Sequence, residues 1–337
     1  MGLLLHHDAV EPVARGLLGS ISCSGGPTFE QQRLLQALLT HLWERPDLRV
    51  EALEPLGPQE LAAALGDLLG DPLGVPSTRR VVHQLQMTLE FCRHPQTEAQ
   101  LQLAQAYAEA LGVNSDALEV SRDWLQQGVE QAAADVGRIF NAFLPLRSEP
   151  GLADPLASAQ QPEPELVARI EGFAQLPEGS LGRALLGYYA CFGFPMPGQE
   201  ACALNHLYLA HDMTHVIAGI AATPAGEIAL SAFQLAMQDN PINESALLAS
   251  LVTHEAGFVS ANPTLAPEQS SLDSPSAAYL LASELKRGSA CSADFSLVDH
   301  LALAPLPLAA VRQRFNVCPP LRPSSVDHLF WEPGAVF

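Results

Sequence analysis

The sequence has 337 residues, of which 48% are hydrophobic, 16% charged and 6% aromatic. This composition is typical of a globular chain with a large core and excludes a disordered one. A formal net charge of -20 and a single lysine, Lys286, exclude nucleic acid as a partner, because phosphate binding needs a basic surface. The same balance argues against docking on anionic lipid through a polybasic segment.

Between Phe29 and Phe143 the apolar residues recur at helical spacing, which predicts a stack of helices. The last of these is expected to be one long helix from Ser115 to Phe143. Capping residues, a helix-starting proline and a terminal glycine mark the expected helix ends: Thr28 with Gln31, Pro58, Thr97 and Gly112.

Residues 147–165 are rich in Pro, Ala, Ser and Gln without periodicity, which predicts a linker. Helical pattern returns near residue 166, continues to about 256, and reappears at 277–287 and 307–315. Strand signals are sparse throughout. The expected fold is therefore all-α, with two helical domains, residues 1–146 and 166–337, joined by the linker.

Six cysteines form no CxxC pair and no zinc-ribbon spacing, so we expect reduced thiols in a cytoplasmic protein. The N-terminus has no basic region before its short apolar run. No stretch of about 18 apolar residues occurs. We therefore expect a chain that is neither exported nor membrane-spanning.

The segment HDMTHVIAGIAATPAGE, residues 211–227, places four metal-ligand side chains in an apolar stretch. His211 and His215 lie one helical turn apart on the same face, while Asp212 lies about 100° round from His211. A new helix is expected to begin near Pro224, and Glu227 in its first turn can return to the histidines if the two helices pack antiparallel.

Two imidazoles and two carboxylates suit a divalent ion such as zinc, iron(II), manganese or cobalt, and magnesium stays open. A pair of hydrogen-bonded core histidines is the structural alternative. The two acids favour the metal site, because a buried carboxylate without a partner costs several kcal/mol. The predicted ligands are His211, Asp212, His215 and Glu227, and no catalytic residue is assigned.

Other reaction classes fit this pattern less well. A zinc peptidase of the HExxH type needs a glutamate where Asp212 stands, one methylene longer, to reach the metal-bound water. A phosphohydrolase with an His-Asp pair needs a distant upstream histidine, and His206 is too near. Nucleotide-binding motifs are absent, since no GKS/T loop and no GxGxxG after a strand occurs, and the GxSxG nucleophile elbow is absent as well.

The N-terminal half resembles the TerB-like helical domain associated with tellurite resistance. The segments LLGSISCSGGPTFEQQRLLQALL and LEFCRHPQTEAQLQLAQAYAEALGV share its layout of loop, capping Thr, acid and amphipathic helix. The acidic metal-binding turns of that domain are replaced here by Cys-Ser-Gly-Gly at 23–26 and Arg-His-Pro-Gln at 93–96. The resemblance therefore implies the fold and no metal.

The C-terminal half, over residues 160–322, resembles the ubiquinone-biosynthesis family that is the fourth of the Coq proteins. His-Asp-x-x-His, eleven residues and Glu is that family's metal motif. LPEGSLGRAL at 176–185, GEIALSAFQLAMQ at 226–238 and VDHLALAPLPLAAVRQRFNV at 298–317 are similar to its other segments. At 206–209, where many members carry Arg-Tyr-Arg-Glu, this chain has His-Leu-Tyr-Leu.

This resemblance implies an all-helical, metal-dependent protein of quinone or prenyl-lipid metabolism that binds a prenylated aromatic or quinone-like molecule. It implies ring decarboxylation or hydroxylation, or a non-catalytic lipid-binding scaffold for other quinone-biosynthesis proteins. Peripheral contact with the inner membrane surface and a homo-oligomer are also expected. Residues 187–198, GYYACFGFPMPG, are the candidate membrane-facing or channel-mouth loop, and secondary site candidates are Arg183, His206, His254 and Glu255.

Overall fold

The computed structural model describes residues 5–23, 25–69, 76–147, 149–152, 162–199, 206–258, 269–322 and 325–331. Within these ranges the regular structure is helical, apart from two isolated bridges that join Ser180 to Pro307 and Ala256 to Gln269. The prediction of an all-α fold is therefore confirmed. No helix in the described part of the chain has both the length and the apolar character to cross a membrane.

The helices of the first half are α1 His7–Ile21, α2 Phe29–Ala37, α3 Pro58–Leu69, α4 Pro76–Phe91, α5 Glu98–Leu111, α6 Asp116–Gln127 and α7 Val129–Phe143. Those of the second half are α8 Pro164–Gly172, α9 Leu181–Phe192, α10 His206–Ala218, α11 Pro224–Met237, α12 Pro241–His254, α13 Pro275–Ser289, α14 His300–Leu303 and α15 Leu308–Arg314. Short turns of other helix types are η1 Leu38–Leu42, η2 Val50–Ala52, η3 Leu144–Arg147, η4 Phe173–Gln175 and η5 Val326–His328.

The capping signals lie where the sequence predicts them. Thr28 and Gln31 form a reciprocal capping box at α2, and Thr97 accepts from the N–H of Gln100 at α5. Gly112 ends α5 with a φ of 66°, the left-handed conformation that glycine adopts without strain. Helix α1 was not predicted from the sequence, although its apolar face is buried.

The single long helix expected from Ser115 to Phe143 is wrong. Gly128 adopts φ 97° and ψ 171°, which breaks the chain into α6 and α7. Only glycine takes this conformation readily, since a Cβ atom would clash with the backbone. The apolar pattern continues across the break because both helices bury the same kind of face, so periodicity alone misses it.

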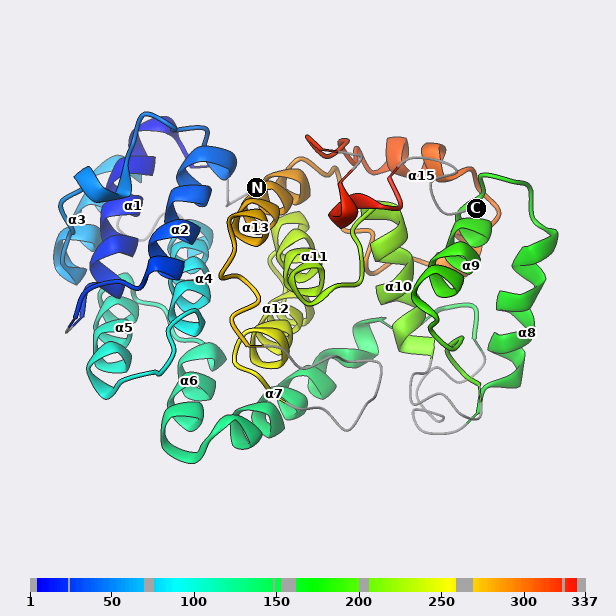
Figure 1. Ribbon diagram of the computed structural model, residues 1–337, viewed down its shortest axis with the longest axis horizontal. Helices are drawn as coiled ribbons and strands as arrows, with labels where there is room; N and C mark the ends of the chain where they lie inside the picture. Colours follow the sequence, from blue (N-terminus) through cyan, green and yellow to red (C-terminus); the bar gives the residue numbers. More distant parts are fainter. Residues whose placement is uncertain are drawn as a thin grey trace.

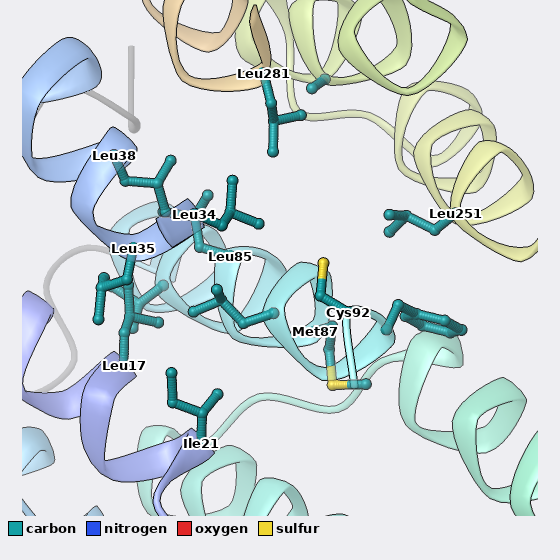
Figure 2. Packing of buried hydrophobic residues seen from close by; sticks show 14 of the residues in the cluster. Leu17, Ile21, Leu34, Leu35, Leu38, Leu85, Met87, Cys92, Leu251 and Leu281 are labelled. Atoms are coloured by element: carbon teal, nitrogen blue, oxygen red, sulfur yellow. The ribbon is translucent and has the colours of Figure 1, made fainter. Parts of the chain in front are cut away.

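The core of the first half is completed by helices from the second half. One buried cluster joins α1–α7 with α11, α12 and α13. Figure 2 shows Leu34 of α2 and Leu38 of η1 beside Leu85 of α4, with Leu281 of α13 and Leu251 of α12 facing the same region. A second buried cluster joins α8, α9, α10, α15 and other faces of α11. In Figure 1, α11–α13 accordingly lie between α1–α5 at one end and α8 and α9 at the other.

The first residues of the expected linker are anchored rather than exposed. Arg147 and Glu149 are buried, and Glu149 Oε1 lies 2.7 Å from Nδ1 of His300. Residues 148 and 153–161 of the linker lie outside the described residues. The boundary between residues 1–146 and 166–337 stays a prediction, although the apolar packing extends across it.

The loop expected at residues 187–198 is wrong for its first half, whereas the membrane contact expected of this segment stays a prediction. Residues 187–192 are the end of α9, and Tyr188 and Tyr189 are 1% and 4% exposed. The ring of Tyr188 contacts Phe192, Phe194 and Phe330 at centroid distances of 5.2–5.8 Å. These aromatic residues form part of the second buried cluster. The sequence does not reveal this, because an aromatic-rich stretch next to prolines looks the same whether it is buried or exposed.

Candidate metal centre

The antiparallel return that the sequence predicts is built by a short turn between α10 and α11. Helix α10 ends at Ala218, and Gly219 takes a φ of 74° that starts the reversal. Thr223 then caps α11 by accepting from the N–H of Gly226, with Pro224 at the first position. Glu227 consequently stands in the first turn of α11, against the last turns of α10.

The structure brings His211, His215 and Glu227 together. His211 Nε2 lies 3.1 Å from one oxygen of Glu227, and His215 Nε2 lies 3.2 Å from the other. One ligand atom from each of the three residues lies within 4.8 Å of the others. Both imidazoles thus face the carboxylate with their Nε2 atoms, as the ligands of a shared cation would.

The outer nitrogen of His215 fixes the state of its ring. His215 Nδ1 lies 3.0 Å from the carbonyl oxygen of Ile220, which only accepts, so Nδ1 carries the proton. In the neutral ring, Nε2 then presents a lone pair to the Glu227 carboxylate. Among the described residues this buried Nε2 has no hydrogen-bond partner. A positive charge between the two groups, carried by a proton or by a metal ion, makes their approach favourable.

The structure places Asp212 behind His211 rather than beside Glu227. Asp212 is 5% exposed, receives a hydrogen bond of 3.0 Å from the hydroxyl of Tyr189, and lies 3.2 Å from Nδ1 of His211. A carboxylate on the outer nitrogen of a ligand histidine fixes its tautomer and raises its basicity. In this geometry Asp212 orients His211, and the three facing groups are His211, His215 and Glu227.

The charges of the cluster are strongly coupled. Burial lowers the pKa of His211, but the charges of Glu227 and Asp212 outweigh it and raise that pKa to about 9. Burial raises the pKa of Glu227, yet His215 and His211 hold it well below its usual range. Without a cation the site therefore contains an imidazolium and a carboxylate, and Glu227 stays ionised as a metal ligand must be.

Two buried arginines stabilise the end of α10. Arg312 donates to the carbonyl oxygens of Val216 and Ile217 at 3.0 Å each, and Arg287 donates to that of Ala218 at 2.8 Å. These carbonyls belong to the last turn of the helix and lack intrahelical partners. Cations there also oppose the helix dipole. The helix end that carries His215 is thereby held in place.

An apolar cavity of about 560 Å³ lies beside the second core. It is bounded by α9, α15 and the C-terminal segment. Its polar lining residues are Glu178, Arg183, Arg312 and Gln313, and its apolar ones include Ala184, Leu308, Val317, Leu329, Phe330 and Trp331. Phe330 lies 5.3 Å from Tyr188, and the Tyr188 ring stacks on His215 at 5.6 Å. The rings of Phe330 and Tyr188 thus link the lining of the cavity to His215 through successive contacts.

The secondary candidates lie in different places. Arg183 is exposed, lines the cavity and donates to the carbonyl of Ala174. The side chain of His206 lies outside the described residues. Glu255 contacts His94 of the first half, so it is not part of this cluster. Sequence reasoning missed Tyr188 and Tyr189, which no spacing rule links to the His211–Glu227 motif.

Replacing Gly226 by alanine is expected to lower both stability and metal affinity. A Cβ atom there would lie 2.0 Å from the carbonyl oxygen of Ala221, so the first turn of α11 must move and take Glu227 with it. Thermal unfolding and zinc titration measure the two effects. Gly137→Ala in α7 is the matched control, because its Cβ meets nothing within 4 Å and alanine stabilises a helix by about 0.5–1 kcal/mol. Equal behaviour of the two variants would contradict the expectation.

No protein-family model matches the chain, and no curated protein matches it. The chain is similar to the crystal structure of a protein assigned to ubiquinone biosynthesis from Nostoc punctiforme, with 18% identity. The alignment covers 70% of this chain and 97% of that chain, with a TM-score of 0.33. A likeness at this level does not establish membership of a family, so the two resemblances of the sequence stay predictions.

Proposed function

We propose that the chain binds a divalent cation through His211, His215 and Glu227, with Asp212 orienting His211. The observation that carries this proposal is the buried Nε2 of His215, which faces a carboxylate oxygen at 3.2 Å without a hydrogen bond in the described structure. Hydrogen-bonded core histidines, the alternative from the sequence, would give this nitrogen a partner. Two nitrogens and a carboxylate suit zinc, iron(II) or manganese, and three protein ligands leave positions open.

We further propose that the partner molecule is a prenylated aromatic or quinone-like compound in the apolar cavity. A volume of about 560 Å³ lies within the range of small-molecule sites, roughly 300–1,000 Å³. An isoprenoid tail matches the leucine, valine and aromatic lining, and each buried CH₂ contributes about 0.8 kcal/mol. Arg183 and Glu178 offer polar contacts to a ring substituent.

For an enzyme, the cation would supply Lewis-acid or oxygen-activating chemistry for decarboxylation or hydroxylation of the ring. The protein's own contribution is to hold His215 in one tautomer through Ile220 and to fix His211 through Asp212. Tyr188 shields His215 from the cavity side, and burial raises its pKa well above the usual value, so it stays a neutral phenol.

A scaffold that binds lipid without turnover is the second candidate, and one observation favours it. The described residues that line the cavity include none of His211, His215 and Glu227. A molecule that fills this cavity is separated from the cation by Tyr188 and Phe330. In this role the cation holds α10 to α11, and the loaded chain presents its lipid to quinone-biosynthesis proteins at a membrane surface.

Protein purified from its own cells is expected to carry a prenylated aromatic molecule, seen by native mass spectrometry and solvent extraction. Ala309 lies on the exposed face of α15 and lines the cavity. Ala309→Trp is expected to lower the fraction of protein that carries the lipid about tenfold, which corresponds to a loss of about 1.4 kcal/mol of binding free energy. The control is Ala310→Trp, because Ala310 is exposed on the same helix but is not among the residues that line the cavity. Conversion of the added lipid by metal-loaded protein distinguishes enzyme from scaffold. Lipid-free protein, or equal loading of both variants, would contradict the proposal.

A further inference from the structure

A second cluster of metal-ligand side chains lies far along the sequence from the first. It consists of Glu30 in the first turn of α2, His94 in the turn after α4 and Glu255 at the end of α12. One ligand atom of each lies within 4.8 Å of the others. The three residues therefore converge from three separate segments at the contact between the first half and α12.

The two carboxylates of the cluster are buried, and its histidine is partly exposed. Glu30 and Glu255 are 7% and 0% exposed, and the side chain of His94 is 16% exposed. His94 Nε2 lies 3.0 Å from one oxygen of Glu255, and the N–H of Leu272 donates to the other at 3.0 Å. Glu255 is thus held by both the first half and the segment that leads into α13.

One carboxylate oxygen of Glu30 lacks a partner. Its Oε1 atom is buried and makes no hydrogen bond among the described residues. A buried carboxylate oxygen without a partner is costly, and a second carboxylate beside it adds repulsion. Arg33, the nearby cation, is already paired with Asp273 at 2.7 Å. Glu255 also stands at the C-terminal end of α12, where the helix dipole disfavours negative charge.

We propose that Glu30, His94 and Glu255 bind a second divalent cation, of the zinc, iron(II) or manganese class, which fastens α2 and the α4–α5 turn to α12. One imidazole and two carboxylates form a suitable ligand set, drawn in to about 2.0–2.2 Å from the ion. The amide nitrogen of Gln269 lies 3.4 Å from His94 Nδ1. In the metal-bound form Nδ1 would carry the proton, and the Gln269 amide turned by 180° would accept it through its oxygen. The burial of both carboxylates, with only His94 partly exposed, fits a structural ion better than a catalytic one.

A shared proton is the competing explanation for the same geometry. Burial and the charge of Glu255 raise the pKa of Glu30 to about 9, so a protonated Glu30 could donate to Glu255 instead. The two explanations differ for Glu30→Gln, because the amide imitates the protonated acid but does not neutralise or bind a cation. Under the shared-proton explanation this variant leaves stability and metal content unchanged.

The test is zinc titration of the chelator-treated, full-length chain, together with thermal unfolding in the presence and absence of zinc. Wild type is expected to bind two ions, and Glu30→Gln and His215→Ala one each. The double variant should bind none. At each site the loss of zinc affinity should exceed the ~10- to 100-fold loss that follows removal of a residue that only contacts a ligand. Glu90→Gln is the matched control, since this buried acid also has an unpartnered oxygen but faces Gln100.

Two ions in Glu30→Gln, with the unfolding temperature and its rise with zinc unchanged, would overturn the second site. One ion in wild type that survives His215→Ala but not Glu30→Gln would support the second site and refute the first. One ion that survives Glu30→Gln but not His215→Ala would do the reverse. The failure of either site is therefore visible separately from the other.

Discussion

Replacing His215 by alanine is expected to remove one divalent cation per chain, whereas His254→Ala is expected to leave the metal content unchanged. His215 is fully buried and its Nε2 faces Glu227, with no other described group to take its place. His254 is also buried and lies at the end of α12, so it matches His215 in burial and helix position but is not part of either metal-capable cluster. Elemental analysis of protein from cells grown with trace metals measures the difference.

Glu227→Gln refines the test, because it keeps the volume of the side chain and removes only its charge. The variant is expected to lose the same ion, with a fall in zinc affinity beyond about 100-fold, since a ligand contributes more than its outer-shell partner. Asp212→Asn should weaken binding by about 10- to 100-fold, in line with its contact to the outer nitrogen of His211. Unchanged metal in His215→Ala and Glu227→Gln would eliminate the proposed centre.

Arg312→Met is expected to destabilise the fold by about 3 kcal/mol or more. The guanidinium donates to Val216 and Ile217 at the end of α10 and to Phe330 and Trp331 of the C-terminal segment. Each buried carbonyl left without a donor costs about 1–3 kcal/mol. Methionine fills the space over Trp331 but replaces none of these hydrogen bonds.

Arg314→Met is the matched control for Arg312→Met, two residues further along α15. Arg314 is exposed and its guanidinium lies over the ring of Phe315 without a buried carbonyl partner in the described structure. A surface change of this kind stays within about 0.5 kcal/mol. Urea unfolding followed by circular dichroism compares the two. A similar midpoint for both variants would show that α10 does not depend on Arg312.

The centre between α10 and α11 could be predicted from the sequence because its residues are local. Histidines four residues apart share a helix face, and Thr223 with Pro224 marks the start of the next helix. These local signals are enough to predict that Glu227 lies near the two histidines. The position of Asp212 was not predictable in the same way. Whether its carboxylate faces the ion or the outer nitrogen depends on Tyr189, a contact across 23 residues.

The cluster at Glu30 shows the opposite case. Its members are 64 and 161 residues apart along the chain, and His94 and Glu255 meet only because α12 packs on the first half. Nothing in the spacing of these three residues signals a contact. The division at Gly128 was missed for a different reason, since a single glycine in a periodic stretch is compatible with an unbroken helix as well.

The shared core has a consequence for how the chain can be divided. Leu251, Leu281 and Leu285 complete the apolar packing of helices that come more than a hundred residues earlier. A fragment that stops before α8 would expose the apolar face that α11–α13 cover in the whole chain. A fragment that starts at α8 would expose the matching apolar faces of α11–α13. Cleavage within residues 153–161 should therefore yield two pieces that stay associated, and each piece expressed alone should aggregate.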